Sequence, residues 1–394
     1  MAINGKDTII AFSHIWILYF ILRYLKKQNI KKKTNNYIIY IGLLSALGTG
    51  IQLVFLGSLI PVFLFTLAEI FIFKKIINNN FILKKFFLDA FKSFVVFYLI
   101  LMLFWIDVHS NILLLPILTI FETLSSSYIT GSPFNLVNGN YYLSTEIPKL
   151  YLLSNYLFKS PEYFLILYIF FIYLLIKPNK FFTKEFKNFY YKLSLVFLIL
   201  IFPNLILFII PFPIYDGMRL FIWTIPYFCI IPGLSFYYFI RNFKLLISKI
   251  SLLFLSFFII FYLFNFFSIT PYQYTYLNIL NGKNESNYKK FENDYWGSSI
   301  NELVKISNFD NNKKIIVSTC GVNPKIVKKY FKLKGYSNVH FAHPDEADYI
   351  IMTNRVVLDT DFKTMTNCFD KFKGENVFIV KRKGLLLSVI RKIS

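Results

Sequence analysis

The sequence is poor in acidic residues, in histidine and in cysteine. It holds 21 Asp and Glu against 43 Lys and Arg, with 4 His and 3 Cys in 394 residues. The cysteines match no zinc-site spacing and the histidines are isolated, so no metal cluster is predicted. In the polar C-terminal part of the chain, a predicted strand ends in a glycine at Ser318–Val322. This segment is neither a P-loop nor a dinucleotide-binding glycine motif. The nucleotide sites that depend on those motifs are therefore excluded.

Apolar residues are what the chain has in excess. Hydrophobic residues make up 56% of it, with 48 Phe and 28 Tyr. No soluble core could bury so many apolar segments, so lipid must solvate much of the chain. Segments of roughly 17–25 apolar residues can cross a bilayer as helices. Eight spans are predicted, at about 8–25, 37–55, 57–73, 86–106, 162–177, 188–210, 219–240 and 246–268.

Positive charge gathers in every second loop between these predicted spans. Short cytoplasmic loops carry an excess of Lys and Arg, so the pattern indicates orientation. It places the N-terminus, the loops at 107–160 and 211–218 and the C-terminal part outside the cytoplasm, in a bacterial inner (plasma) membrane. The net charge of +22 would also attract nucleic acid, but the topology signal and anionic membrane lipids explain these loops. We therefore expect membrane lipids and no nucleic acid as partners. The basic loop residues include Lys26, Lys27, Lys74, Lys75, Lys180, Lys184, Arg241 and Lys244.

The chain changes character near residue 270. Residues 1–269 are predicted to form the transmembrane body, with a long outer loop at 107–160, and residues 270–394 a small extracytoplasmic α/β domain. Strands are predicted at 314–321, 339–342, 347–352 and 376–380, with a helix from Pro324 and a hairpin at Gly384. An extracytoplasmic compartment permits a Cys320–Cys368 disulfide, and two separate buried thiols fit the sequence equally.

Few ionisable residues fall on the predicted outer face, and each is a functional candidate because charge is costly at membrane depth. Asp7 directly precedes the first span, where the helix dipole alone would also favour a carboxylate. Asp216 and Arg219 stand where the seventh span begins. An arginine there can bind a phosphate through two nitrogens, and a local Asp–Arg pair capping the helix is the alternative. The remaining outer-facing candidates are Asp107, His109, Glu122 and Glu146.

The loop at 107–160 combines aromatic rings with hydrogen-bonding groups. Tyr141, Tyr142, Glu146 and Tyr151 form a mixture suited to binding sugars. Interfacial tyrosines are also ordinary membrane anchors, which is the alternative for each ring taken singly. His14, inside the first span, is interpreted as a polar packing contact.

Several segments resemble one class of enzyme. Pro271–Asn278 and Phe291–Ser299 resemble the region after the last helix in bacterial multispanning glycosyltransferases related to the protein O-mannosyltransferases, the GT-C class, family 39-like. Tyr215–Arg219 is similar to their Tyr-Asp-Gly-Trp-Arg-His signature, with Met218 and Leu220 in place of Trp and His. Tyr141–Tyr151, followed by Ser160-Pro161, looks like their long outer loop. The resemblance covers most of residues 5–300.

This resemblance implies a GT-C-like helical fold and transfer of a sugar from a polyprenyl-phosphate-linked donor to a glycan, lipid or protein acceptor. A carboxylate serves as general base, and cationic groups or a divalent metal steady the departing phosphate. The family's first acidic loop has no counterpart here, so we expect an N-terminally shortened chain with Asp7 as the catalytic carboxylate. Asp216, Arg219, Tyr141, Tyr142, Glu146 and Tyr151 are the expected substrate-binding residues.

Two alternatives stay open at the level of sequence. A catalytically inactive fragment or accessory of such an enzyme would keep the outer domain and lose the acids. A lipid or sugar transporter would share the topology, but transporters usually show repeated halves with broken helices and midplane charges. No such repeat is visible in the sequence.

Overall fold

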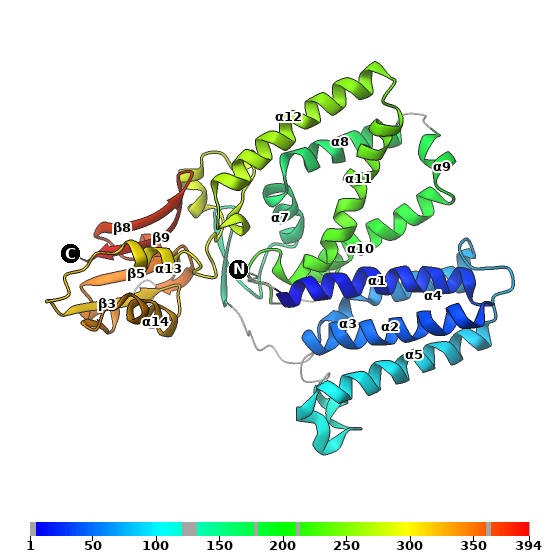
Figure 1. Ribbon diagram of the computed structural model, residues 1–394, viewed down its shortest axis with the longest axis horizontal. Coiled ribbons are helices and arrows are strands. Elements are labelled where there is room, and N and C mark those ends of the chain that lie inside the picture. The colour runs from blue at the N-terminus through cyan, green and yellow to red at the C-terminus, as the bar shows by residue number, and fades with distance from the viewer. Residues whose placement is uncertain (1–4, 120–131, 177–179, 210–212, 360–363, 394) are drawn as a thin grey trace. The chain divides into compact units, whose positions relative to one another are not determined.

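The computed structural model describes residues 5–119, 132–176, 180–209, 213–359 and 364–393 (Figure 1). Contacts divide the chain into two compact units, each built from separate stretches of sequence. Unit 1 comprises residues 1–128, 171–209 and 218–238, and unit 2 comprises residues 129–170, 210–217 and 239–394. The domain boundary predicted at residue 269 falls inside unit 2 and stays a prediction.

Unit 1 is helical. Helices α1 (Gly5–Lys27), α2 (Lys31–Ile51) and α5 (Leu83–Phe104) lie side by side (Figure 1). Gly42 of α2 permits this packing, because a Cβ there would lie 2.7 Å from the Ser93 carbonyl oxygen of α5. The other elements, in chain order, are α3 (Phe55–Ser58), α4 (Ile60–Ala68), the π-helix η1 (Glu69–Phe73), the 3-10 helix η2 (Ile106–Asn111), α9 (Phe181–Glu185), α10 (Phe189–Ile209), the 3-10 helix η3 (Arg219–Thr224) and α11 (Ile225–Arg241).

Six helical segments of the described chain are long and apolar enough to cross a membrane: Gly5–Lys27, Phe55–Phe73, Leu83–Phe104, Phe189–Ile209, Arg219–Arg241 and Leu246–Ser268. A seventh would be the pair α7 (Tyr151–Lys159) and α8 (Glu162–Ile176), which is bent by 113°. The protein is thus an α-helical polytopic membrane protein with a C-terminal strand-containing domain.

The predicted count of eight spans is therefore wrong, for two reasons of length. The predicted span at 37–55 is α2, which starts with three lysines and ends at Ile51, so its apolar part is short. The predicted span at 162–177 is α8, whose 15 residues extend only about 22 Å. The hydrocarbon layer is about 30 Å thick, so α8 alone does not cross it.

Unit 2 joins helical segments to strands. Its helices are α7, α12 (Leu246–Ser268), α13 (Ile300–Ile306), α14 (Pro324–Lys334) and α15 (Cys368–Lys371), with most of α8. Short 3-10 turns fill the segment from Gln273 to Lys289. Strands β1 (Phe134–Val137) and β2 (Asn140–Leu143) form one antiparallel hairpin, and β6 (Val356–Asp359) and β7 (Thr364–Asn367) form another.

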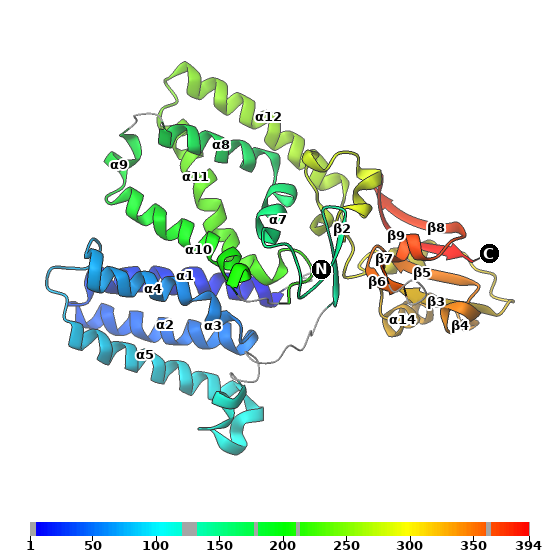
Figure 2. The same cartoon turned by 180° about the vertical axis from the view of Figure 1, so that it is seen from behind.

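A five-stranded sheet of order β4-β3-β5-β9-β8 forms the centre of the C-terminal domain (Figure 2). Strands β3 (Ile315–Cys320), β4 (Val339–Phe341) and β5 (Tyr349–Thr353) are parallel, and β9 (Leu385–Lys392) runs antiparallel to β5 and to β8 (Glu375–Arg382). Side chains alternate across a strand. Ile351 of β5 therefore packs with α13 and α14, whereas Ile350 and Met352 pack with α15.

The local signals in this domain predicted part of its elements, and β6, β7 and α15 were not predicted. Four predicted strands correspond to β3, β4, β5 and β8, and the predicted helix is α14. The Asn323 side chain caps α14 by accepting from the Lys325 N–H at 2.9 Å. The predicted hairpin is the β8–β9 connection, where Lys383 and Gly384 both have positive φ, as a tight two-residue hairpin turn requires.

Cys320 and Cys368 form a disulfide with a Cα–Cα distance of 5.7 Å. The bond joins the end of β3 to the start of α15 and is buried among Ile350, Met352 and Phe369. The structure thereby decides between the two possibilities that the sequence left open. Disulfides persist in oxidising compartments. Cys229, the third cysteine, is free.

We predict that only one of the three cysteines reacts with a maleimide-coupled polyethylene glycol when the purified protein is unfolded without reductant. All three should react after reduction, because reduction releases Cys320 and Cys368. The measurement is the gel mobility of the labelled chain, and Cys229→Ser should shift both counts down by one. Labelling of all three cysteines before reduction would contradict the disulfide.

Candidate functional site

Asp7 and Arg219 form an ion pair in unit 1. Asp7 Oδ2 lies 3.4 Å from Arg219 Nε, and the two side chains are 4% and 18% exposed. Asp7 is in the first turn of α1, where the helix dipole favours a carboxylate. Arg219 begins the segment Arg219–Arg241. The pair therefore shows that these two apolar helices start at the same face.

The opposite ends of the same two helices are basic. Lys26 and Lys27 occupy the last turn of α1, and Arg241 ends α11. Basic ends mark the cytoplasmic side of a membrane protein. The Asp7–Arg219 pair lies at the other end of these two helices.

His14 lies two turns along α1 from Asp7. Its Nδ1 is 2.7 Å from the Tyr227 hydroxyl, its Nε2 is 2.9 Å from the Ser58 carbonyl oxygen, and its ring contacts Trp223. Buried polar groups need such partners. The contacts agree with the interpretation of His14 as a polar packing residue.

In unit 2, one guanidinium joins two buried carboxylates. Arg355 Nη1 lies 2.7 Å from Asp216 Oδ1 and 3.4 Å from Glu292 Oε2. Glu292 Oε1 also accepts from the Val356 N–H at 3.0 Å. Burial raises the pKa of Glu292 to about 7, although the charge of Arg355 acts in the opposite direction. The two carboxylates in turn raise the pKa of Arg355. This group of residues is called the Arg355 network below.

The Arg355 network and a hydrogen bond of Tyr151 bring together three segments that hold predicted site residues or motifs. Asp216 comes from Tyr215–Arg219, Glu292 from Phe291–Ser299, and Tyr151 from the end of the predicted outer loop. The Tyr151 hydroxyl donates to the Gly217 carbonyl oxygen at 3.3 Å, and its ring is fully buried. Asp216 and Gly217 both have positive φ, so a left-handed turn precedes Arg219 in the chain.

A small cavity of about 10 Å³ lies beside the Arg355 network, with room for about one water molecule. Its lining includes Asn155, Lys159, Gly217 and Glu292. Asn155 Oδ1 is buried without a hydrogen-bond partner. A Cβ at Gly217 would lie 2.6 Å from Lys159 Nζ, so a larger residue there would displace the ammonium group. The cavity is too small for a sugar.

Polar residues of the motif Phe291–Ser299 form hydrogen bonds that hold the local fold. Asp294 accepts from the N–H groups of Ser298 and Ser299 at 2.8 and 2.9 Å, just before α13, and from the Tyr274 hydroxyl. Burial raises the pKa of Asp294. Asp294 therefore fixes the start of α13 and the segment Pro271–Asn278, to which Tyr274 belongs.

Three other predicted site residues lie in the strand β2 and just after it. Tyr141 and Tyr142 are half-buried in β2, where Tyr142 pairs with Asn135 across the hairpin. Burial raises the pKa of Tyr141, with a smaller effect from Asp370. Glu146 is exposed at the turn after β2.

Of the remaining outer-facing candidates, His109 has a described side chain. His109 Nε2 contacts the Met102 carbonyl oxygen at 2.6 Å. Glu122 and the side chain of Asp107 lie outside the described residues. Within the described ranges, no three of His, Cys, Asp and Glu lie close enough together to hold a metal ion.

Sequence reasoning missed Arg355 and Lys159. Arg355 follows the buried strand β5 as Asn354-Arg355, a position where a lone arginine carries no motif. Asn354 accepts from the Asn293 N–H at 2.9 Å, so the segment after β5 is joined to the Phe291–Ser299 motif at two places. The one available signal was charge, because the two motifs together hold three carboxylates, Asp216, Glu292 and Asp294, and one cation, Arg219.

Comparison of the chain with protein-family models, with curated proteins and with solved structures finds no match in any of the three.

We predict that Arg355→Ala destabilises the protein by about 3–5 kcal/mol, because it removes the guanidinium that pairs with two buried carboxylates. Arg382→Ala is the matched control, since its pair with Glu302 is 26% and 31% exposed and is worth less than about 1 kcal/mol. The measurement is thermal unfolding in detergent. Equal loss in both variants would show that the Arg355 network adds no stability of its own.

Glu292 should make stability depend on pH. Its folded-state pKa of about 7 exceeds its usual value, so its stabilising contribution is complete below about pH 4.5 and is lost as the pH rises through 7. We expect Glu292→Gln to flatten the fall of the unfolding temperature between pH 5 and 7. A thermal unfolding series at several pH values measures this, and identical slopes for wild type and variant would refute it.

Proposed function

We propose that this protein is a membrane glycosyltransferase that moves a sugar from a polyprenyl-phosphate-linked donor to an acceptor at the extracytoplasmic face. The observation that carries the proposal is the Asp7–Arg219 pair, a carboxylate and a guanidinium held 3.4 Å apart where two apolar helices begin. Both groups have the chemistry that such a transfer needs, and they lie at the helix ends opposite the basic residues.

The proposed reaction assigns one role to each group. Asp7 accepts the proton of the acceptor hydroxyl, whose oxygen attacks the anomeric carbon of the sugar. The bond between that carbon and the phosphate oxygen breaks, and the electron pair leaves with the polyprenyl phosphate. Arg219 binds the phosphate, because its planar guanidinium matches phosphate oxygens and stays charged. The attack on the face opposite the leaving group inverts the anomeric centre.

The Arg355 network supports the proposal as a positioning device. It holds Asp216 and Gly217, which directly precede Met218 and Arg219 in the chain. A fixed turn at this point restricts the backbone from which Arg219 extends. The segments that resemble glycosyltransferase motifs thus have a common structural role, and the resemblance and the geometry favour the same function.

The proposal includes the location of the site. The Cys320–Cys368 disulfide favours an oxidising compartment for the C-terminal domain. The basic ends of α1 and α11 favour the cytoplasm for the opposite face. We accordingly propose a bacterial plasma-membrane protein whose C-terminal domain is extracytoplasmic, with glycan, lipid or protein as the acceptor.

We expect Asp7→Asn to lower sugar transfer by about 10²–10⁴-fold, the range for loss of a general base, since Asn keeps the shape without the basicity. Arg219→Ala should weaken binding of the lipid-phosphate donor. Lys6→Ala is the control, because Lys6 is the exposed neighbour of Asp7. The measurement is transfer of labelled sugar from a short-chain polyprenyl-phosphate donor by protein in liposomes.

Two results would count against this proposal. One is absence of transfer by the wild type with every donor sugar tried, and the other is full activity of Asp7→Asn. Folding of each variant is checked by gel filtration and thermal unfolding in detergent. Loss of folding in Asp7→Asn would move the test to Arg219→Lys, which keeps the charge but loses the planar fork.

A further inference from the structure

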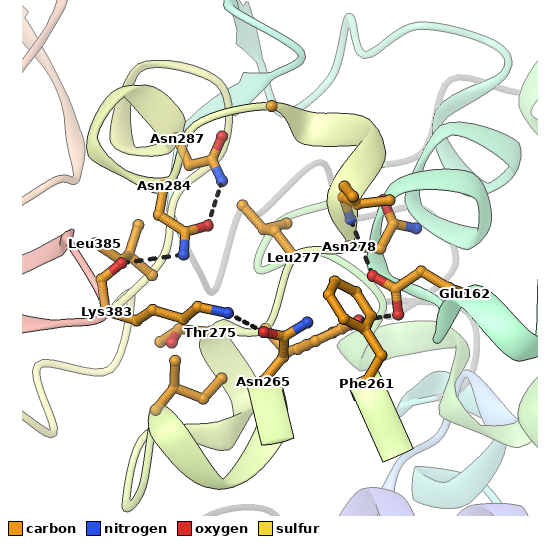
Figure 3. A pocket seen from close by; sticks show the side chains of 14 residues that line it. Glu162, Phe261, Asn265, Thr275, Leu277, Asn278, Asn284, Asn287, Lys383 and Leu385 are labelled. Atoms are coloured by element: carbon orange, nitrogen blue, oxygen red, sulfur yellow. Dashed lines mark hydrogen bonds between the residues drawn. The ribbon is translucent and has the colours of Figure 1, made fainter. Parts of the chain in front are cut away.

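Unit 2 contains a pocket of about 180 Å³ at the C-terminal end of α12 (Figure 3). Phe261, Asn265 and Ile269 line it from successive turns of this last apolar segment and the residue after it. Facing them is Thr275–Ile279. This stretch overlaps the motif Pro271–Asn278, which the proposed reaction does not use. The pocket therefore gives that motif a location and a candidate role.

Glu162 provides the negative charge of the pocket. Its side chain is buried, its Oε2 accepts from the Tyr276 hydroxyl at 2.6 Å, and its Oε1 accepts from the Ile279 N–H at 3.0 Å. No lysine or arginine of the described chain forms an ion pair with it. Neutral donors alone hold this carboxylate, and each of its oxygens has capacity for a further hydrogen bond.

Lys383 provides the positive charge from the opposite side (Figure 3). It is exposed in the β8–β9 turn, and its ammonium group donates to Asn265 Oδ1. The Asn284 amide donates to the Lys383 carbonyl oxygen at 3.0 Å, which holds the turn against the pocket. Apolar atoms of Phe261 and Leu277 complete the lining.

Size and charge narrow the class of ligand. Pockets for drug-sized molecules measure roughly 300–1,000 Å³, so this one suits a single small group. An anion would meet the Glu162 carboxylate, and a cation would meet Lys383. Hydroxyl groups both donate and accept, so an uncharged polyol can use the carboxylate, the ammonium group and the Asn265 amide together. The apolar atoms can receive the C–H face of a sugar ring.

We propose that this pocket binds one uncharged sugar residue. Its place at the end of α12 would hold that sugar at the level of the lipid headgroups. The sugar of a lipid-linked donor and the terminal sugar of an acceptor glycan share this chemistry. The inference depends on the pocket itself and goes beyond the Asp7–Arg219 reaction.

The test is saturation-transfer NMR of methyl hexopyranosides and methyl N-acetylhexosaminides with the full chain in detergent. We expect saturable binding of at least one glycoside. Glu162→Gln and Asn265→Leu should each weaken it by about tenfold, the loss expected for one hydrogen bond to a charged or well-placed polar group. Ser256→Ala, an exposed polar site on α12 outside the pocket, should leave it unchanged.

Competition assigns the source of the sugar. A short-chain polyprenyl-phosphate sugar that displaces the glycoside would assign the pocket to the donor, and an oligosaccharide that displaces it alone would assign the pocket to the acceptor. Either result supports a sugar site. Because the Asp7→Asn variant should still bind the glycoside, failure of transfer and failure of this pocket are separate outcomes.

Three results would overturn the inference. The first is no saturable binding of any uncharged glycoside to the wild type. The second is binding that neither pocket variant changes while both remain folded by thermal unfolding. The third is binding of phosphoethanolamine or inorganic phosphate alone, which would make the pocket a site for charged headgroups.

Discussion

The buried charge of Arg355 is the constraint on which unit 2 depends. Two carboxylates, Asp216 and Glu292, lie buried far apart in the sequence, and each would be costly without a cation. Arg355 pairs with both and so joins the segments that hold Asp216 and Glu292 to the end of β5. The Tyr151–Gly217 hydrogen bond and the hydrogen bonds of Asp294 before α13 act in the same way. In each case a buried polar group fixes the position of irregular backbone.

The Asp7–Arg219 pair plays a different part in unit 1. Asp7 is buried and Arg219 is 18% exposed, and the pair stands where two apolar helices begin. In the proposed function this pair is the reactive centre, and the pocket beside α12 binds a sugar.

Local patterns predicted much of the fold. They failed where the length of a helix set the number of spans and where contacts between distant residues set the pairing of charges. The strands β3, β4, β5 and β8 and the helix α14 follow from residue periodicity and capping. Two predicted spans were wrong because α2 is polar at its start and α8 is too short. Of the candidate site, Asp7 pairs with Arg219, and Asp216 pairs with Arg355. The sequence offered no local signal for that partner.

The sequence by itself determined that lipid must solvate most of the chain, where the basic ends lie and which short segments form strands. These properties depend on composition and on neighbours within a few residues. Only the tertiary structure decided that Cys320 bonds Cys368, that Arg355 joins Asp216 to Glu292, and that Glu162 and Lys383 face one pocket. Such pairings join residues far apart in the chain, and their energies exist only once folding has brought the groups within contact distance.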